Sequence, residues 1–310
     1  MPGVGRSGIL IIEKGPGVSS FHAVAHLRRV LRAGKVGHGG TLDPEATGVL
    51  PILVNEATKL TPYFVDHDKE YVATVRLGVV TDTQDLSGTV LRTSPVPVLT
   101  AGDIEAALGR FVGLIQQVPP MFSALHRGGR RLYELARQGV EVEREPREVQ
   151  IHSLALESVA LPSFTIRVVC GRGTYIRTLC CDLGDALGPG AALERLVRTR
   201  VGPFRLEDAL PWALVGEARD PPVFWERLLP PDSALAGRPK VTLEAGAAEA
   251  LLHGQAVPVP AADAGARGVA RVYAADGDFL GVGRVVEGGE RVKPERILHG
   301  DRPRSRVLPA

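Results

Sequence analysis

The sequence has little of what marks secreted, disulfide-stabilised or membrane proteins. It contains only three cysteines, Cys170, Cys180 and Cys181, and this odd number gives no disulfide framework. We expect them to be small buried hydrophobic side chains. No apolar run approaches the length that crosses a membrane, and the N-terminus lacks the basic-then-apolar pattern of a signal peptide. These absences predict a soluble cytoplasmic protein.

An excess of charge of one sign is also missing. The formal net charge is +2 over 310 residues, which gives no global field that would indicate a nucleic-acid partner. The segment from Arg167 to Arg205 is locally basic, with seven arginines against three acidic residues. This surplus is compatible with a surface that faces phosphates, but charge alone favours an ordinary solvated face.

The common metal and nucleotide motifs are absent or out of context. His22 and His26 share a helix face, but Ala23 stands where a zinc protease helix needs glutamate. The glycines between residues 3 and 8 match a dinucleotide-binding spacing, but no strand precedes them. Neither a GxxxxGK[ST] loop nor a GxSxG motif occurs. The sequence therefore predicts no metal and no cofactor.

Hydrophobic periodicity predicts strands and helices in no regular alternation. Residues 9–14 form an apolar run typical of a buried strand, and residues 69–80 alternate as in a half-buried strand. Residues 149–161 and 164–171 indicate antiparallel strands, and a helix is expected over residues 174–187. Because βαβ regularity is lacking, the pattern predicts an α+β fold.

Cap and turn residues mark further boundaries. Asp103 is expected to cap a helix that runs to about residue 112. Residues 117–139 begin as a proline-rich loop and end as an amphipathic helix. Prolines and a glycine near residues 230–240 indicate a domain boundary, and residues 269–286 beyond it are expected to form a hairpin.

Residues 37–48, GHGGTLDPEATG, present one carboxylate in an unusual setting. The glycines permit sharp turns and close approach of a ligand. Pro44 biases the preceding Asp43 toward an extended or turn conformation. Asp43 is therefore expected on a shaped loop, whereas Glu45 is expected to face solvent and not to act as a second catalytic acid.

Asp43, Tyr71 and Arg177 each lie in an apolar, glycine-shaped stretch. If Arg177 lies beside Asp43, its charge keeps the carboxylate ionised. An ionised, oriented aspartate is a usable nucleophile toward the anomeric carbon of a sugar. Tyr71 offers a flat face for stacking a base and a hydroxyl for proton transfer. The plainer alternative is a buried ion pair and a core tyrosine.

Several blocks of the chain together resemble the TruB family of pseudouridine synthases. GHGGTLDPEATGVLPI is similar to the family's signature motif. KEY, RLG and TDTQDLSG, then QVPPMFSALHRGGRRLYELARQG, then GRGTYIRTLCCDLG and LVRTRVGPF follow in the family's order. The resemblance covers about residues 8 to 208, together with a tail similar to the family's PUA-like C-terminal domain.

The resemblance implies an activity and a fold. It implies isomerisation of uridine 55 in the T loop of tRNA to pseudouridine, without cofactor or metal. It implies a mixed, mainly antiparallel sheet flanked by helices and loops, with a small β-rich domain behind it. The implied division is a catalytic domain over residues 1–235 with a thumb insertion at about 119–147, an RNA-binding domain over 236–300, and a disordered tail over 301–310.

The resemblance also implies a role for individual residues. Asp43 occupies the position of the catalytic aspartate, Tyr71 that of the tyrosine that stacks on the target base and moves a proton, and Arg177 that of the arginine that pairs with the aspartate. The implied RNA contacts are His38, which holds the target uridine flipped out, Leu42, Tyr175 and Leu196 in the uracil pocket, and Arg127, Arg130 and Arg131 in the thumb.

The chain departs from the family's pattern in three places. Phe122 stands where the family commonly has tyrosine, and His126 stands where it commonly has lysine. Both departures lie in the thumb, so they bear on RNA affinity more than on chemistry. Gly15 stands where the first loop often has proline.

Three functional hypotheses remain open at this stage. The first is a stand-alone tRNA pseudouridine synthase, expected to be monomeric and to need neither a protein partner nor a membrane. The second is a tRNA-folding chaperone that uses the same surface. The third is a guide-RNA-dependent catalytic subunit, although such relatives generally lack the long thumb. The chemical route also stays open, because Asp43 can act by attack at C1′ or by a route that involves deprotonation at C2′.

Overall fold

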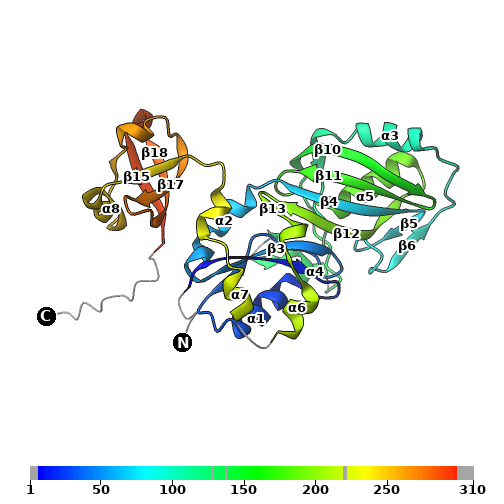
Figure 1. Cartoon of the computed structure of the whole chain (residues 1–310). Helices are drawn as coiled ribbons and strands as arrows, with labels where there is room; N and C mark the ends of the chain where they lie inside the picture. Colours follow the sequence, from blue (N-terminus) through cyan, green and yellow to red (C-terminus); the bar gives the residue numbers. More distant parts are fainter. Residues whose placement is uncertain (1–5, 124, 128, 137, 219–221, 299–310) are drawn as a thin grey trace.

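A computed structural model describes residues 6–298 except 124, 128, 137 and 219–221 (Figure 1). Its main feature is a ten-stranded sheet. Along the main path of the sheet the strands are β14 (Leu210–Pro211), β1 (Gly8–Lys14), β3 (Thr47–Val54), β12 (Ala191–Val201), β4 (Lys69–Leu77), β11 (Ser163–Cys170), β10 (Arg147–Ala160) and β7 (Gly113–Gln117); β2 (Val36–His38) pairs with β3, and β13 (Phe204–Arg205) pairs with β12.

Most neighbours in this sheet are antiparallel. The two parallel pairs are β1 with β14 and β3 with β12. The predicted α+β fold with a mixed, mainly antiparallel sheet is therefore confirmed. The predicted strands at residues 9–14, 149–161 and 164–171 correspond to β1, β10 and β11.

Helices cover the sheet and close its core. They are α1 (Ser20–Val30), α2 (Thr61–Val65), α3 (Ala101–Gly109), α5 (Ile176–Leu187), α6 (Trp212–Glu217) and α7 (Pro222–Glu226). The helix predicted over 174–187 is α5, which packs on β12 and on α3. A small sheet of β5 (Val79–Thr81) and β6 (Val90–Thr93) lies at the same end of the large sheet as α3 and α5 (Figure 1).

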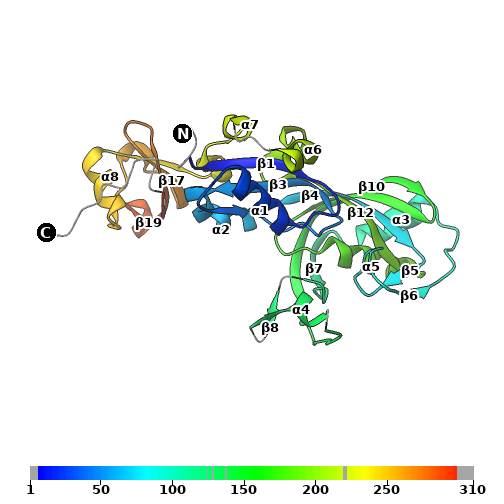
Figure 2. The ribbon, with the colours of Figure 1, turned by 90° about the horizontal axis from the view of Figure 1, so that it is seen from below.

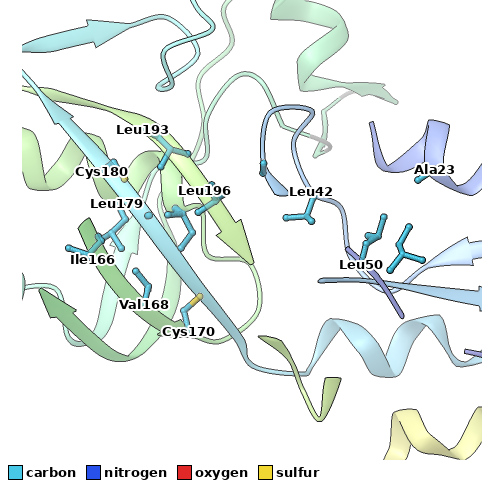
Figure 3. Close-up of a cluster of buried hydrophobic side chains, with 14 of the residues drawn as sticks. Ala23, Leu42, Leu50, Ile166, Val168, Cys170, Leu179, Cys180, Leu193 and Leu196 are labelled. Atoms are coloured by element: carbon cyan, nitrogen blue, oxygen red, sulfur yellow. The ribbon is translucent and has the colours of Figure 1, made fainter. Parts of the chain in front are cut away.

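One hydrophobic cluster spans both halves of the sheet and surrounds the segment that carries Asp43. Figure 3 shows Leu42 between a group that includes Leu196 and Val168 and a group that includes Leu50 and Ala23. Of the cysteines, Cys170 and Cys180 are buried and Cys181 is partly buried. The loop before β3 is therefore anchored in the core by its own leucine.

A five-stranded sheet forms a separate unit toward the C-terminus (Figure 1). Its strands are, in sheet order, β15 (Lys240–Leu243), β17 (Gly268–Ala274), β18 (Phe279–Val286), β19 (Arg291–Ile297) and β16 (Val257–Pro258), and α8 (Ala245–Leu252) packs on it. The predicted hairpin at 269–286 is β17 and β18. Contacts to the larger part include the hydroxyl of Tyr63, which donates to Glu295 at 3.0 Å.

The thumb, residues 119–147, projects from the larger part (Figure 2). It contains the short hairpin of β8 (His126–Arg127) and β9 (Arg130–Arg131), followed by α4 (Leu132–Ala136). Met121, Leu132 and Leu135 form a small buried cluster of their own. The expected change from loop to helix is therefore confirmed, with a hairpin between them.

The prediction about Asp103 is wrong in detail. Thr100 is the N-cap, and its hydroxyl accepts from the amide of Asp103 at 3.2 Å. The Asp103 carboxylate accepts in return from the amide of Thr100 at 2.8 Å. This reciprocal capping box places the aspartate three residues inside the helix. The helix ends at Gly109, before the predicted residue 112.

Two other features follow from the described residues. In that part of the chain, no helix is both long and apolar enough to cross a membrane. The predicted tail, residues 301–310, lies outside the described residues.

The strand β12 was not expected from periodicity, and it supplies the centre of the site.

Candidate active site

The site lies where β3 and β12 come together. The two strands pair only at Thr47 with Val197 and at Gly48 with Arg198. Gly48 has φ +103°, and a Cβ added there would lie 2.2 Å from the carbonyl oxygen of Arg198. Only glycine permits so close a strand approach at this backbone conformation. The segment of residues 39–46, here called the Asp43 loop, enters β3 at this junction.

The backbone of the Asp43 loop is held at five consecutive carbonyl groups. The donors are two buried cations, one hydroxyl group and one amide. In order, Gly40 O accepts from Arg198 at 3.1 Å, Thr41 O from Arg198 at 3.2 Å, Leu42 O from Ser20 Oγ at 3.0 Å, Asp43 O from the Ala46 amide at 3.1 Å, and Pro44 O from Lys14 Nζ at 2.8 Å.

The Asp43 carboxylate is oriented by Arg177. Arg177 Nε donates to Asp43 Oδ2 at 2.8 Å. The Arg177 side chain is 6% exposed and that of Asp43 is 40% exposed, so the pair is closed on the arginine side and open on the carboxylate side. The structure thus brings together the two residues that the sequence placed 134 positions apart.

Arg177 also fixes two further segments. Its Nη1 donates to the carbonyl of Thr83 and its Nη2 to the carbonyl of Phe122, each at 2.8 Å. Thr83 belongs to the turn between β5 and β6, and Phe122 lies at the base of the thumb. One buried guanidinium therefore joins the Asp43 loop to two segments beside the site.

Tyr71 on β4 lies directly opposite Arg198 on β12 in the antiparallel ladder. Directly opposite residues project to the same face of a sheet. Burial raises the pKa of Tyr71, whereas the positive charge of Arg198 acts in the opposite direction. His38 is partly buried, and its pKa is lowered by burial and by Arg198. The amide of Gly40 donates to His38 Nδ1 at 3.3 Å.

The carboxylate of Asp43 borders a cavity of about 330 Å³. Leu196 lines the same cavity, together with Leu193 and Ala46, and its rim includes Glu45, Asp85, Glu194 and Arg195. Glu45 is exposed, in agreement with the expectation that it faces solvent. A cavity of this size lies in the range of small-molecule pockets. Of the described carboxylates that line it, Asp43 is the one paired with a buried arginine.

The other predicted contacts lie around this cavity but do not all line it. Leu42 is 3% exposed and packs in the core, and Tyr175 begins α5. The amide of Tyr175 donates to Gln117 Oε1 at 3.0 Å, and Gln117 Nε2 donates to the Tyr175 carbonyl at 3.2 Å. Burial raises the pKa of Tyr175. Neither Leu42 nor Tyr175 is among the described residues that line the cavity.

The thumb arginines are placed only by their backbone. Arg127 lies on β8, and Arg130 and Arg131 lie on β9. Their side chains, and that of His126, lie outside what the structure describes. Their predicted contact with phosphates therefore stays a prediction.

Sequence reasoning missed the residues that hold the Asp43 loop from behind. Arg198 is 1% exposed and Lys14 is fully buried. The favoured interpretation of the arginine-rich segment as a solvated face is wrong for Arg177 and Arg198. The available signal was the spacing of Leu196 and Arg198, which share a strand face. Among the described residues, no group of three or more acidic, histidine or cysteine side chains is placed to hold a metal ion.

The mixed sheet and the Asp43 carboxylate paired with a buried arginine fit the class that the sequence motifs indicated, the pseudouridine synthases. Family models match in three parts: the TruB family pseudouridylate synthase N-terminal domain over residues 28–176, the tRNA pseudouridylate synthase B C-terminal domain over 177–236, and the pseudouridine synthase II TruB C-terminal region over 239–298.

Curated relatives match almost the whole chain. A protein of Chromohalobacter salexigens named tRNA pseudouridine synthase B is 48% identical over 292 residues, which cover 94% of each chain. A protein of the same name from Aromatoleum aromaticum is 46% identical and covers 94% of this chain and 92% of that one. The chain therefore belongs to the TruB family of pseudouridine synthases, which are isomerases.

Solved structures agree on the fold. A chain in the crystal structure of a Cbf5-Nop10-Gar1 complex has a TM-score of 0.72 and 25% identity, and the match covers 95% of this chain and 85% of that chain. A chain in a structure of an H/ACA RNP bound to a substrate RNA has a TM-score of 0.69 and 23% identity, which shows the fold alone. The match covers 96% of this chain and 86% of that chain.

Proposed function

We propose that this protein converts uridine 55 in the T loop of tRNA to pseudouridine. The observation that carries the proposal is the half-open ion pair: Arg177 holds the Asp43 carboxylate at 2.8 Å, and the carboxylate borders the cavity. The substrate is supported by the relatives named tRNA pseudouridine synthase B, which match 94% of the chain.

The target base must leave its stack before the site can act on it. A glycosidic carbon inside a folded RNA is not accessible, so the nucleotide is extruded into the pocket. His38 is proposed to hold the flipped nucleotide, because it lies at the end of β2 with its ring against the Asp43 loop. Leu196 is proposed to contact the uracil, because it lines the cavity beside Asp43.

Asp43 then assists cleavage of the bond between C1′ and N1. The carboxylate either attacks C1′ or acts through a route that involves deprotonation at C2′. The detached uracil rotates and forms a new bond between C5 and C1′. A proton leaves C5 and N1 gains one, so substrate and product have the same atoms. Tyr71 is the proposed carrier of the C5 proton.

The pocket must exclude water while the uracil is detached, because water would otherwise capture the sugar. Ala46, Leu193 and Leu196 line the cavity and are at most 7% exposed, so they give it one apolar wall, and Leu42 packs in the core behind the Asp43 loop. The thumb is proposed to close over the RNA, with Arg127, Arg130 and Arg131 as its phosphate contacts.

The remaining assignments are proposals of the same kind. We infer a catalytic domain over residues 1–235 and a PUA-like RNA-binding domain over residues 236–300. We infer a cytoplasmic monomer that acts on the T arm of tRNA without a partner protein. The protein's own thumb, with hairpin and helix, supports independent capture of RNA.

Tritium release tests the proposal. The protein is incubated with tRNA transcript labelled at C5 of uridine, without added metal or nucleotide, beside Asp43→Asn as a variant of the same size. We expect about one tritium released per tRNA, none from the variant, and similar tRNA affinity for both proteins. Tight binding without release by the wild-type protein would support a chaperone instead. Neither binding nor release would support a guide-dependent subunit.

A further inference from the structure

We propose that Arg198 is a positioning residue that keeps Asp43 and Tyr71 in a fixed relation on the two sides of the substrate uridine. It does so by holding the backbone of the Asp43 loop while lying opposite Tyr71 in the sheet. This inference rests on the proposed isomerisation, because it assigns a task within that reaction. Neither the sequence motifs nor the comparisons give Arg198 a role.

The guanidinium of Arg198 contacts the chain on both sides of Asp43. Its Nη2 donates to Gly40 O at 3.1 Å and its Nη1 to Thr41 O at 3.2 Å, three and two residues before the aspartate. Its Nε donates to Val49 O at 2.8 Å, six residues after it. One planar group therefore ties the start of the Asp43 loop to β3, the strand that follows the loop.

The charge of Arg198 is not explained by an ion pair. The residue is 1% exposed, and among the described residues no carboxylate lies within ion-pair distance of it. Burying an unpaired cation is unfavourable, and apolar residues of similar volume often replace buried charges without loss of stability. The guanidinium group is rigid and planar, and three of its nitrogens donate to three carbonyl groups here. No other side chain offers this donor geometry, which explains an arginine at this position.

The same side chain borders the second reacting group. Tyr71 and Arg198 are register partners, and Leu196 lies two residues earlier on the same face of β12. β12 thus supplies the pocket wall through Leu196 and the support of the Asp43 loop through Arg198. A shift of Arg198 would move the loop relative to the phenol of Tyr71 without removing either group.

Reaction geometry is sensitive to such shifts. A misplacement of about 1 Å by a change outside the reacting groups can cost about 100-fold in rate. Phosphate contacts dominate the affinity for nucleic acids, so we expect substrate affinity to be spread over the RNA surface and to depend little on this loop. A positioning role therefore predicts a lower kcat with KM nearly unchanged. A variant that is only partly unfolded would not show this fall once kcat is calculated per molecule of folded protein.

The experiment compares Arg198→Lys and Arg198→Met with a matched control, Arg200→Gln. Arg200 lies on the same strand but donates to Gly202 O at 3.1 Å and approaches Glu70, away from the Asp43 loop. Tritium release gives kcat and KM, and thermal melting selects a temperature at which each variant is folded. Amide hydrogen exchange of the peptide that covers residues 39–46 reports on the loop directly.

We expect kcat of Arg198→Met to fall about 100-fold while KM stays within about threefold. Arg198→Lys keeps the charge and part of the donor set, so it should recover some of the loss. Loop exchange should accelerate in Arg198→Met and remain at the wild-type rate in Arg200→Gln. Normal kcat in folded Arg198→Met, or a lower kcat with unchanged loop exchange, would overturn the inference.

The design separates failure of this inference from failure of the proposed function. If the wild-type protein released no tritium, the proposed function would be wrong, and loop exchange would still test whether Arg198 holds the loop. If the wild-type protein released tritium and all three variants matched it, only the positioning role would be lost.

Discussion

The Asp43 loop and the thumb are both bonded to Arg177, but they are held in opposite ways. The loop makes no core of its own, and its carbonyl groups are bonded by Lys14, Ser20 and Arg198, all distant in sequence. The thumb packs on itself through the cluster that includes Leu132 and Leu135.

This difference matches the demands of the two tasks proposed for these segments. A reacting carboxylate must stay in one orientation, so its loop is fixed by donors from rigid elements. An element that closes over RNA must move without disturbing that orientation, so it carries its own packing. Arg177 contacts both segments, because it donates to the Asp43 carboxylate and to the Phe122 carbonyl. It therefore connects the fixed loop with the base of the thumb.

Removing Arg177 should give the largest effect. Arg177→Ala takes away the partner of Asp43 and leaves the Thr83 and Phe122 carbonyl groups without donors. The reacting carboxylate then loses its orientation and the two freed carbonyl groups let the adjoining segments shift, so we expect the single-turnover rate to fall by more than about 100-fold. Arg172→Ala is the control, because Arg172 is 70% exposed and pairs with Asp66 at the surface. An unchanged rate in Arg177→Ala would reduce the pair to a structural bridge.

Lys14 provides a pH test of the fixed loop. Burial lowers the pKa of its ammonium group from 10.5 to about 8, although the negative charges of Glu45 and Asp43 act to raise it. Because the folded pKa lies below the unfolded one, the unfolded chain binds more protons between pH 8 and 10.5. The free energy of unfolding contributed by Lys14 therefore rises with pH across that window.

The measurement is urea denaturation of the wild-type protein and Lys14→Gln at several pH values. The difference between the two proteins cancels the titration of most other groups. We expect this difference to shift in favour of the wild-type protein by up to about 3 kcal/mol between pH 8 and 10.5. A difference that does not change with pH would show that Lys14 is not a buried charge.

Tyr71→Phe should give the next effect. The ring remains for stacking, and only the hydroxyl is lost, so RNA binding should stay within about threefold. Proton transfer by a positioned group contributes about 100-fold or more, and we expect tritium release to slow by that factor. Release at the wild-type rate would exclude the hydroxyl as the proton carrier.

The thumb should give the smallest effect. Leu132→Ala removes a buried side chain from the small thumb cluster, which costs about 2 kcal/mol. We expect KM for tRNA to rise about tenfold with kcat within twofold, because the Asp43 loop keeps all its donors. The control is Leu114→Ala on β7, where the side chain is 64% exposed. A fall in kcat comparable to that of Tyr71→Phe would show that the thumb shapes the active site itself.

Much of the fold was predictable because local patterns and tertiary environment agree. The apolar run in β1 is buried and β11 alternates in burial, whereas β10 pairs with β11 through two irregularities in register. The strand β12 was not predictable, since Arg195, Arg198 and Arg200 make AALERLVRTRV resemble a charged surface. Arg198 is buried only because loop carbonyl groups from another part of the chain receive its donors.

The candidate site divides in the same way. Asp43 was recognisable from its glycine-rich setting, and the family motifs suggested Arg177 as its partner. Lys14 and Gln117 carried no such signal, because their partners are backbone groups, which every sequence possesses. Asp103 was misplaced because aspartate is favoured both as an N-cap and as the third residue of a capping box.

The most direct test of the contrast between the two segments is amide hydrogen exchange of the wild-type protein, with and without a T-arm RNA. The account predicts slow exchange under both conditions at the loop amides that are hydrogen-bonded without RNA, those of Gly39, Leu42 and Ala46. It predicts faster exchange in residues 119–147 that slows only when RNA is bound. Exchange in the Asp43 loop as fast as in the thumb, slowed only by RNA, would contradict the claim that the site is preformed.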